Sequence, residues 1–265
     1  YAVTDKADGE RYFMVIYKKH CYLISTNLNV KDTGIELKSS EYDNTIFDGE
    51  YIFIPKANRH LYMVFDMLIN CGKDMRPEVS FFKRINEAEK IIHKIFLFEN
   101  QKGFTKSEYK TKGGFDLNDL SKFYEEEIKK SMGALNNDIP IAKKYPLIRC
   151  KYFIGATGAC RWDIYKFAEI MWKKYTEDST VNCPYILDGL IFQPLEQAYV
   201  TNPRDSKLSE LKWKPPYTNS IDFYITFEKD KNTGKILTVY DNSNDEYVRN
   251  RSEEHTSELQ SRETI

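Results

Sequence analysis

The chain has 265 residues, 41% of them hydrophobic and 30% charged, and its formal net charge is -1 because 39 basic residues offset 40 acidic ones. This length allows one sizeable hydrophobic core and part of a second domain, and the balanced charge excludes a protein-wide basic surface for nucleic acid, so any RNA contact must come from a local patch. The five cysteines are scattered without a Cys-x-x-Cys pair, which argues against a structural zinc site and a disulfide framework.

The sequence contains no apolar run long enough to cross a bilayer and no visible signal peptide. We therefore expect a soluble, intracellular protein without a membrane partner. An odd number of unpatterned cysteines also suits a reducing compartment.

The predicted elements combine strands with three helices. Strands are expected where β-branched and aromatic residues gather, at residues 11–17, 21–26, 49–54, 60–68, 147–154 and 185–192. Helical spacing predicts three helices. The first has an apolar face made of Ile85, Ala88, Ile91, Ile92, Ile95 and Phe96, and the second spans residues 120–132 with Asn118 or Asp119 as its cap. The third spans residues 161–175 and is expected to bury Ile164, Phe167, Ala168, Met171 and Trp172. The pattern predicts an α+β fold of mainly antiparallel sheets with flanking helices.

Two segments break this pattern. Residues 101–114 are rich in glycine and lysine and are predicted to form an exposed loop. After Pro216 the pattern changes to short strands at residues 221–228 and 235–240, joined by a hairpin turn at residues 231–234. The change predicts a domain boundary at residues 216–217.

The hexapeptide Lys6-Ala7-Asp8-Gly9-Glu10-Arg11 fits the pattern Lys-x-Asp-Gly-x-Arg, in which a lysine becomes covalently attached to a nucleoside monophosphate. A match this short can arise by chance, so its weight depends on whether the rest of such a pocket is present farther along the chain. Four further blocks come after it in order: Asp48-Gly49-Glu50, Tyr62-Met63-Val64-Phe65-Asp66, Asp188-Gly189-Leu190-Ile191-Phe192 and Leu211-Lys212-Trp213-Lys214-Pro215.

In content and order, these blocks resemble motifs I, III, IIIa, IV and V of the covalent nucleotidyltransferase superfamily, which contains mRNA guanylyltransferases and ATP-dependent DNA and RNA ligases. The resemblance spans residues 1–216. The Leu-Lys-Trp-Lys-Pro block looks like that of mRNA capping enzymes. The longer strings at residues 3–11 and 212–223 look most like the capping enzymes of large nucleocytoplasmic DNA viruses. The resemblance implies an ATP-grasp-like ligase and capping domain followed by an OB-fold.

The same resemblance implies a function. GMP would pass from GTP, through a covalent lysyl-N-GMP intermediate, to the 5′-diphosphate end of RNA, with Mg²⁺ or Mn²⁺ as cofactor. Lys6 is the implied nucleophile, and it must lose its proton before it can attack. Lys212 and Lys214 lie two apart on a predicted strand, so both can reach the α-phosphate and stabilise its charge.

Other motif residues have implied binding roles. Arg11 would hold the ribose and α-phosphate region, Glu50 the ribose hydroxyls or a metal-bound water, and Asp8 belongs to the same nucleotide site. Phe65 and Ile191 would cover the two faces of guanine. Asp188 is the implied direct metal ligand, with Glu50 as a second.

Each of these residues also has an ordinary structural interpretation. Lys6 could be a solvated surface lysine, Arg11 could form a surface salt bridge, and Glu50 or Asp188 could cap a turn. Likewise, Phe65 and Ile191 could be core residues, and Lys212 with Lys214 could protect an exposed strand edge.

Three parts of the chain are expected. Residues 1–216 form the guanylyltransferase domain, without the strands that should precede it, and residues 217–250 form the first strands of an OB-fold. Residues 251–265 read like a translated sequencing adapter, or else a polar natural tail. The sixth, basic motif of the OB-fold is not visible, so the chain as written is predicted to be severely impaired in forming the intermediate.

Alternatives remain open at this point. A ligase using lysyl-AMP would share the same chemistry, and a catalytically silent nucleic-acid or partner-binding module would share the fold. In the large viral enzymes a triphosphatase domain precedes this region and a guanine-N7 methyltransferase follows it. A viral protein of this kind would be found in the host cytoplasm, in the viral factory, or in the virion.

Overall fold

The structure is a computed structural model and describes residues 1–96, 107–110, 117–139, 145–202, 204, 206–218 and 229–235. Contacts divide the chain into two units, residues 1–218 and 219–265. The architecture below is that of the first unit. Among the described residues, no helix is both long and apolar enough to span a membrane.

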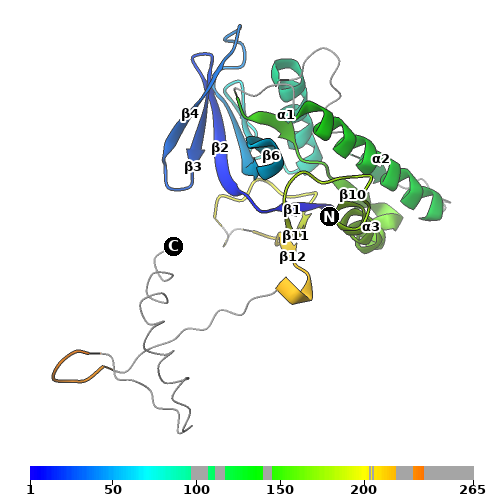
Figure 1. The fold of residues 1–265 in the computed structure, drawn as a ribbon. Helices are drawn as coiled ribbons and strands as arrows, with labels where there is room; N and C mark the ends of the chain where they lie inside the picture. The colour runs from blue at the N-terminus through cyan, green and yellow to red at the C-terminus, as the bar shows by residue number, and fades with distance from the viewer. Residues whose placement is uncertain are drawn as a thin grey trace. The chain divides into compact units, whose positions relative to one another are not determined.

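The described part of the first unit contains two β-sheets (Figure 1). One has the strand order β12-β11-β1-β10-β8, with bounds Leu211–Trp213, Leu187–Gln193, Ala2–Ala7, Ile154–Thr157 and Ser107–Lys110. The other has the order β4-β3-β2-β5-β6-β7, with bounds Val30–Glu36, His20–Ser25, Glu10–Tyr17, Thr45–Ile54, Arg59–Asn70 and Lys73–Asp74, and β9 (Leu147–Cys150) also pairs with β6. All these pairings are antiparallel except β8 with β10 and β6 with β9, so the mainly antiparallel prediction is confirmed.

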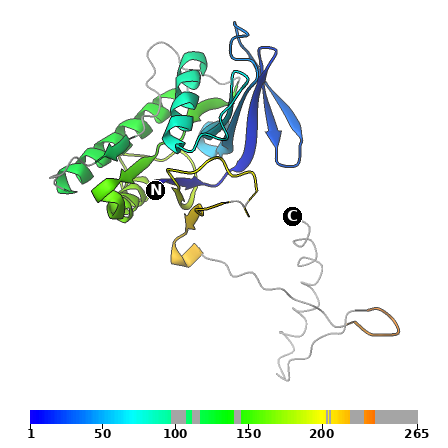
Figure 2. The same cartoon turned by 180° about the vertical axis from the view of Figure 1, so that it is seen from behind.

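The α-helices of the described ranges pack against the sheets, as both views show (Figures 1 and 2). Helix α1 (Phe81–Phe96) buries Ile85, Ala88, Ile91 and Ile92 in a core that it shares with strands β2, β5 and β6. Helices α2 (Leu117–Asp138) and α3 (Ile164–Thr176) contribute to a second core, to which strands of both sheets also contribute. The α+β fold and the apolar faces predicted for the first and third helices are therefore confirmed, although Trp172 is only partly buried.

Helix boundaries differ from the predictions at two places. Helix α2 begins at Leu117, so Asn118 and Asp119 lie inside the helix and neither is its cap. Residues 161–163, expected to begin the third helix, belong instead to a 3₁₀ helix at Gly158–Asp163 that precedes α3. Both errors lie at helix ends, where local preferences are weakest.

The segment predicted as one strand at residues 147–154 is two strands in different sheets. Strand β9 pairs with β6, the chain then crosses at residues 151–153, and β10 pairs with β1. Every residue from Leu147 to Ala156 is buried. The segment has two charged residues, Arg149 within β9 and Lys151 at the crossing, so charge alone does not mark where the first strand ends.

The loop predicted at residues 101–114 is wrong for Ser107–Lys110, which form β8 and pair in parallel with β10. Backbone pairing at the sheet edge outweighs the low strand preference of this segment. The remaining residues of that prediction, the strand predicted at 221–228, and all of the strand predicted at 235–240 except Lys235 lie outside the described residues. The turn predicted at residues 231–234 is confirmed, with Gly234 at φ +66° and its amide donating to the Asp230 carbonyl at 2.9 Å.

A partly buried histidine makes stability depend on pH. The His60 ring stacks on Tyr51 with ring centroids 4.5 Å apart, and the Lys31 ammonium also lies over the Tyr51 ring. Burial, and then the positive charge of Lys31, lower the pKa of His60. A lowered pKa means that the unfolded chain binds the proton more readily, so stability falls as pH drops below the unfolded value of about 6.5.

We therefore expect His60→Phe to reduce the loss of stability between about pH 7.5 and pH 5.5, on either side of the unfolded pKa, while keeping the ring stack. Urea unfolding midpoints at both pH values, for wild type and variant, measure this difference. Equal pH dependence in the two proteins would exclude His60 as its source.

Candidate active site

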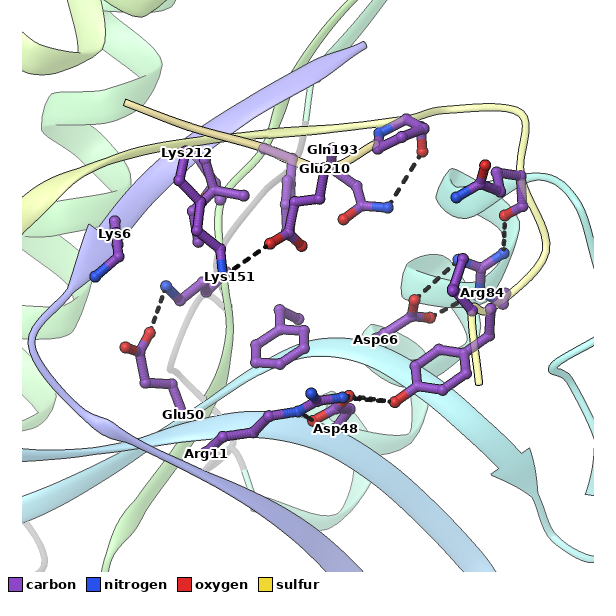
Figure 3. Close-up of a pocket in the computed structure, with 18 of the residues that line it drawn as sticks. Lys6, Arg11, Asp48, Glu50, Asp66, Arg84, Lys151, Gln193, Glu210 and Lys212 are labelled. Carbon is purple, nitrogen blue, oxygen red and sulfur yellow. Dashed lines mark hydrogen bonds and ion pairs between the residues drawn. The ribbon is translucent and has the colours of Figure 1, made fainter. Parts of the chain in front are cut away.

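A cavity of about 570 Å³ opens between the two sheets (Figure 3). Lys6, Ile191 and Lys212 reach it from the strands of the five-stranded sheet. Side chains of β2, β5 and β6 line it from the other sheet; they are Arg11, Asp48, Glu50, Phe65 and Asp66. Residues of all five sequence blocks therefore line one cavity, and the fold brings together positions as distant in sequence as Lys6 and Lys212.

Lys6 forms part of a three-residue ionic cluster. Its ammonium donates to the Oδ2 atom of Asp188, and the Nζ of Lys214 lies 2.9 Å from the same oxygen. Lys6 is 22% exposed, so a ligand in the cavity can reach its amine. Burial works to raise the pKa of Asp188, but the hydrogen bonds from Lys6 and Lys214 outweigh it and hold that pKa below its ordinary value.

Two motif glycines make this geometry possible. Gly189 pairs with Lys6 across the sheet and has φ +145°, and a Cβ there would lie 2.0 Å from the Trp213 carbonyl oxygen. At Gly9, a Cβ would lie 2.8 Å from side-chain carbons of Glu50 and Ile52. Both glycines therefore permit close backbone approach, which brings β12 and β5 up to the lysine motif.

Arg11 is held by a buried carboxylate. Its Nε and Nη2 atoms donate to Asp48 Oδ1 at 3.0 Å and Oδ2 at 2.6 Å, and Asp48 is fully buried. The Tyr199 hydroxyl donates to the same Oδ2 at 2.6 Å and accepts from Arg11 Nη2 at 2.8 Å. The hydrogen bond to Asp48 raises the pKa of Arg11, so its charge is permanent at the cavity wall.

Glu50 is paired with a buried lysine. Lys151 is only 1% exposed, and its Nζ lies 2.7 Å from Glu50 Oε2 (Figure 3). The same ammonium donates to the Asp5 main-chain oxygen at 3.0 Å. The Asp5 carboxylate lies 3.7 Å from the same nitrogen. Burial opposes the charge, but Asp5 and Glu50 outweigh it and raise the pKa of Lys151. The lysine thus links the Glu50 strand to the residue before Lys6.

The remaining predicted residues are placed as follows. Phe65 and Ile191 both line the cavity, and Lys212 lines it with its Nζ 3.5 Å from Glu210. Lys214 follows β12 and reaches Asp188. Asp8 is exposed and outside the cavity lining, where its amide donates to the Ile186 carbonyl at 3.0 Å. The predicted nucleotide contact of Asp8 has no support in this geometry.

The carboxylates predicted to bind metal are Asp188 and Glu50, and each is paired with lysine. Over the described ranges, no group of three or more His, Cys, Asp or Glu side chains could hold a metal ion. Mg²⁺, however, is often held by one or two carboxylates together with substrate phosphates and water. Glu50 lines the cavity, whereas Asp188 lies outside its lining, beside Lys6.

Several residues of the site were missed by the sequence interpretation. They are Asp5, Lys151 and Tyr199, together with Arg84, which forms a buried two-point ion pair with Asp66 at 2.8 and 2.9 Å. A lysine inside an apolar run was a usable signal for Lys151, because a buried charge needs a partner. Tyr199 and Arg84 have no comparable local signal.

The sequence is similar to those of known mRNA-capping enzymes. Residues 1–112 match the family model described as mRNA capping enzyme, catalytic domain. Over 251 residues, 92% of this chain and 20% of the relative, the chain is 36% identical to a probable mRNA-capping enzyme of Acanthamoeba polyphaga mimivirus. It is 27% identical over 228 residues to the mRNA-capping enzyme of African swine fever virus, covering 85% of this chain and 18% of that protein. A shorter match, 46% identical over 50 residues, 19% of this chain and 8% of the relative, is to an mRNA-capping enzyme of Caenorhabditis elegans. The chain spans about a fifth of the length of the viral relatives.

Proposed function

Because this chain is a relative of the mRNA capping enzymes in their catalytic domain, we propose that it is an mRNA guanylyltransferase. It transfers GMP from GTP, through covalent lysyl-N-GMP at Lys6, to the 5′-diphosphate end of RNA. The observation that carries this proposal is the convergence of Lys6, Asp188 and Lys214 beside a cavity lined by Arg11 and Glu50.

The proposed reaction has two displacements at one phosphorus. In the first, the deprotonated Nζ of Lys6 forms a bond to the α-phosphorus of GTP, and the bond from that phosphorus to pyrophosphate breaks. In the second, a terminal oxygen of the RNA diphosphate forms a bond to the same phosphorus, and the P–N bond breaks to return the lysine amine. Lys6 is thus nucleophile first and leaving group second.

The shared carboxylate supports this use of Lys6. Asp188 Oδ2 accepts from both Lys6 and Lys214, so Lys214 keeps the carboxylate paired when Lys6 turns to the nucleotide. Lys214 and Lys212 carry positive charge to the α-phosphate, where negative charge grows during displacement. Arg11 binds the ribose and α-phosphate region, and Phe65 and Ile191 cover the faces of the guanine.

A divalent cation is part of the proposal. Asp188 and Glu50 are the carboxylates that would hold Mg²⁺ or Mn²⁺, since hard oxygen ligands suit both ions. Bound there, the ion would supply positive charge that offsets the phosphates of GTP.

The finer domain assignments are also proposals. We take residues 1–216 as the nucleotidyltransferase domain of ATP-grasp-like type and residues 217–250 as the start of an OB-fold, which the hairpin turn at residues 231–234 supports. Residues 251–265 remain outside both. A triphosphatase and a guanine-N7 methyltransferase elsewhere in the parent protein, and a place in the host cytoplasm or virion, remain predictions.

Labelling with a nucleotide tests the proposed function. With Mg²⁺ or Mn²⁺, we expect α-labelled GTP to attach label to the protein in a form that is labile to acid and stable to alkali, and ATP to attach none. Addition of RNA with a 5′-diphosphate end should move the label to the RNA, whereas RNA with a 5′-monophosphate should not.

Other outcomes reassign the protein. Label from ATP would identify a ligase. No label from a protein that extends through the complete OB-fold would favour a silent nucleic-acid or partner-binding module. The predicted impairment of the chain as written would be contradicted by labelling as strong as that of the extended protein.

A further inference from the structure

We infer that Tyr199 is a positioning residue for the nucleotide, and that it acts by fixing the guanidinium of Arg11 in the orientation that meets the substrate. The inference rests on the proposed function, because it assumes that a nucleoside triphosphate occupies the cavity. Tyr199 lies 188 residues from Arg11 in sequence and belongs to none of the five sequence blocks.

The contacts form a closed ring of three side chains. Asp48 accepts from Arg11 and from the Tyr199 hydroxyl, and that hydroxyl accepts from Arg11. Asp48 is fully buried, so its charge has no water to stabilise it and depends on these donors. Tyr199 therefore stabilises the buried carboxylate and the arginine together.

A count of donors shows what Arg11 has left for a ligand. The guanidinium carries five N–H groups, and the ring uses the one on Nε and both on Nη2. The two N–H groups of Nη1 have no partner among the described residues, and Arg11 lines the cavity. They form a planar pair of donors suited to phosphate or ribose oxygens. Fixing Nε and Nη2 fixes the direction of Nη1.

Tyr199 is itself held from outside the ring. Its amide donates to the Arg76 carbonyl at 2.9 Å. Two residues earlier, the Gln197 carbonyl accepts from Arg84 Nη1 at 2.9 Å. Arg84 belongs to α1 and is locked by its ion pair with Asp66 (Figure 3). The hydroxyl is thus placed before a ligand arrives, which is the condition for preorganised binding.

Removing the hydroxyl should weaken nucleotide binding without destroying the site. In Tyr199→Phe the two-point bond between Arg11 and Asp48 remains, but one Nη2 N–H loses its acceptor and the guanidinium gains freedom to turn. Loss of one such hydrogen bond predicts a dissociation constant for GTP about three- to tenfold higher. The rate of labelling at saturating GTP should change little, since Tyr199 does not touch the reacting atoms.

The test is a double-mutant cycle read by equilibrium dialysis with labelled GTP, which does not require the covalent step. Wild type, Tyr199→Phe, Arg11→Lys and the double variant are compared. If Tyr199 acts through Arg11, adding Tyr199→Phe to Arg11→Lys has little further effect, because lysine cannot form the ring. Tyr12→Phe is the matched control: it removes the Tyr12 hydroxyl, which donates to the exposed Glu10 at 3.3 Å outside the cavity.

Each outcome decides the inference. Unchanged GTP binding in Tyr199→Phe would overturn the inference. So would a loss of GTP affinity on adding Tyr199→Phe that is equal in wild type and in Arg11→Lys. Neither result contradicts the proposed function. Absence of both GTP binding and label in a protein that extends through the complete OB-fold would overturn the proposed function and the inference with it. The expected result is a loss of GTP affinity in Tyr199→Phe that is absent when Arg11→Lys is already present.

Discussion

Lys6→Ala should abolish covalent attachment of GMP, with a loss of roughly 10³-fold or more, because it removes the proposed nucleophile. Lys6 lines the cavity and is ion-paired with Asp188, and its amine is the proposed nucleophile. The fold should survive, since the Lys6 side chain is not fully buried. Protein-bound label after incubation with α-labelled GTP and Mg²⁺ or Mn²⁺, at whatever level the wild type reaches, measures the effect.

Lys83→Ala is the matched control for this experiment. Lys83 is also a lysine paired with a carboxylate, that of Glu78, but it lies on α1 outside the cavity. It should label as wild type does. Label that persists in Lys6→Ala would contradict the assignment and move the nucleophile to Lys151, Lys212 or Lys214, which mass spectrometry of the labelled peptide would identify.

Lys151→Met should lower the free energy of unfolding by about 3–5 kcal/mol, the usual effect of removing one partner from a buried ion pair. Lys151 and Asp5 are each 1% exposed, and Glu50 is 14% exposed. Without the ammonium, two carboxylates in a poorly solvated place lose their counter-charge, and the Asp5 main-chain oxygen loses its donor. Urea unfolding followed by circular dichroism measures the change.

The chain provides a matched control for this variant as well. Lys174 also lies between two carboxylates, at 2.9 Å from Asp178 and 3.3 Å from Glu125, but its side chain is 22% exposed. Lys174→Met should cost about 1 kcal/mol or less, because water can solvate the charges that it leaves. Similar losses in the two variants would show that burial of Lys151 is not the cause.

The part of the site that could be predicted is the part encoded in short blocks. Lys6, Arg11 and Glu50 stand in such blocks. The blocks also contain Gly9 and Gly189, and the backbone approaches so closely at both positions that a side chain would not fit. The pairing of Lys6 with Asp188, 182 residues away, was not predicted, because the sequence interpretation assigned Asp188 to metal binding. The role assigned to each of these residues remains a prediction.

The part that could not be predicted depends on long-range contacts without a local pattern. The Tyr199 hydroxyl donates to Asp48, which is 151 residues away in sequence. The sequence between Tyr199 and β12 has no hydrophobic periodicity from which this contact could be predicted. The crossing at residues 151–153 looked like continuous strand, because the chain is buried without a break from Leu147 to Ala156. By contrast, the helical period of α1 was clear, since one face packs on a sheet and the other meets water.

The close approach at Gly189 limits how this protein can vary. Any side chain at that position would meet the Trp213 carbonyl at 2.0 Å and would also occupy a backbone conformation that L-residues rarely adopt. To make room, β12 would have to move away from β11, and Lys212 and Lys214 would move with it. In a library of all single substitutions, position 189 should therefore accept glycine alone. Even Gly189→Ala should fail a selection for catalytic activity under conditions in which the protein is still expressed.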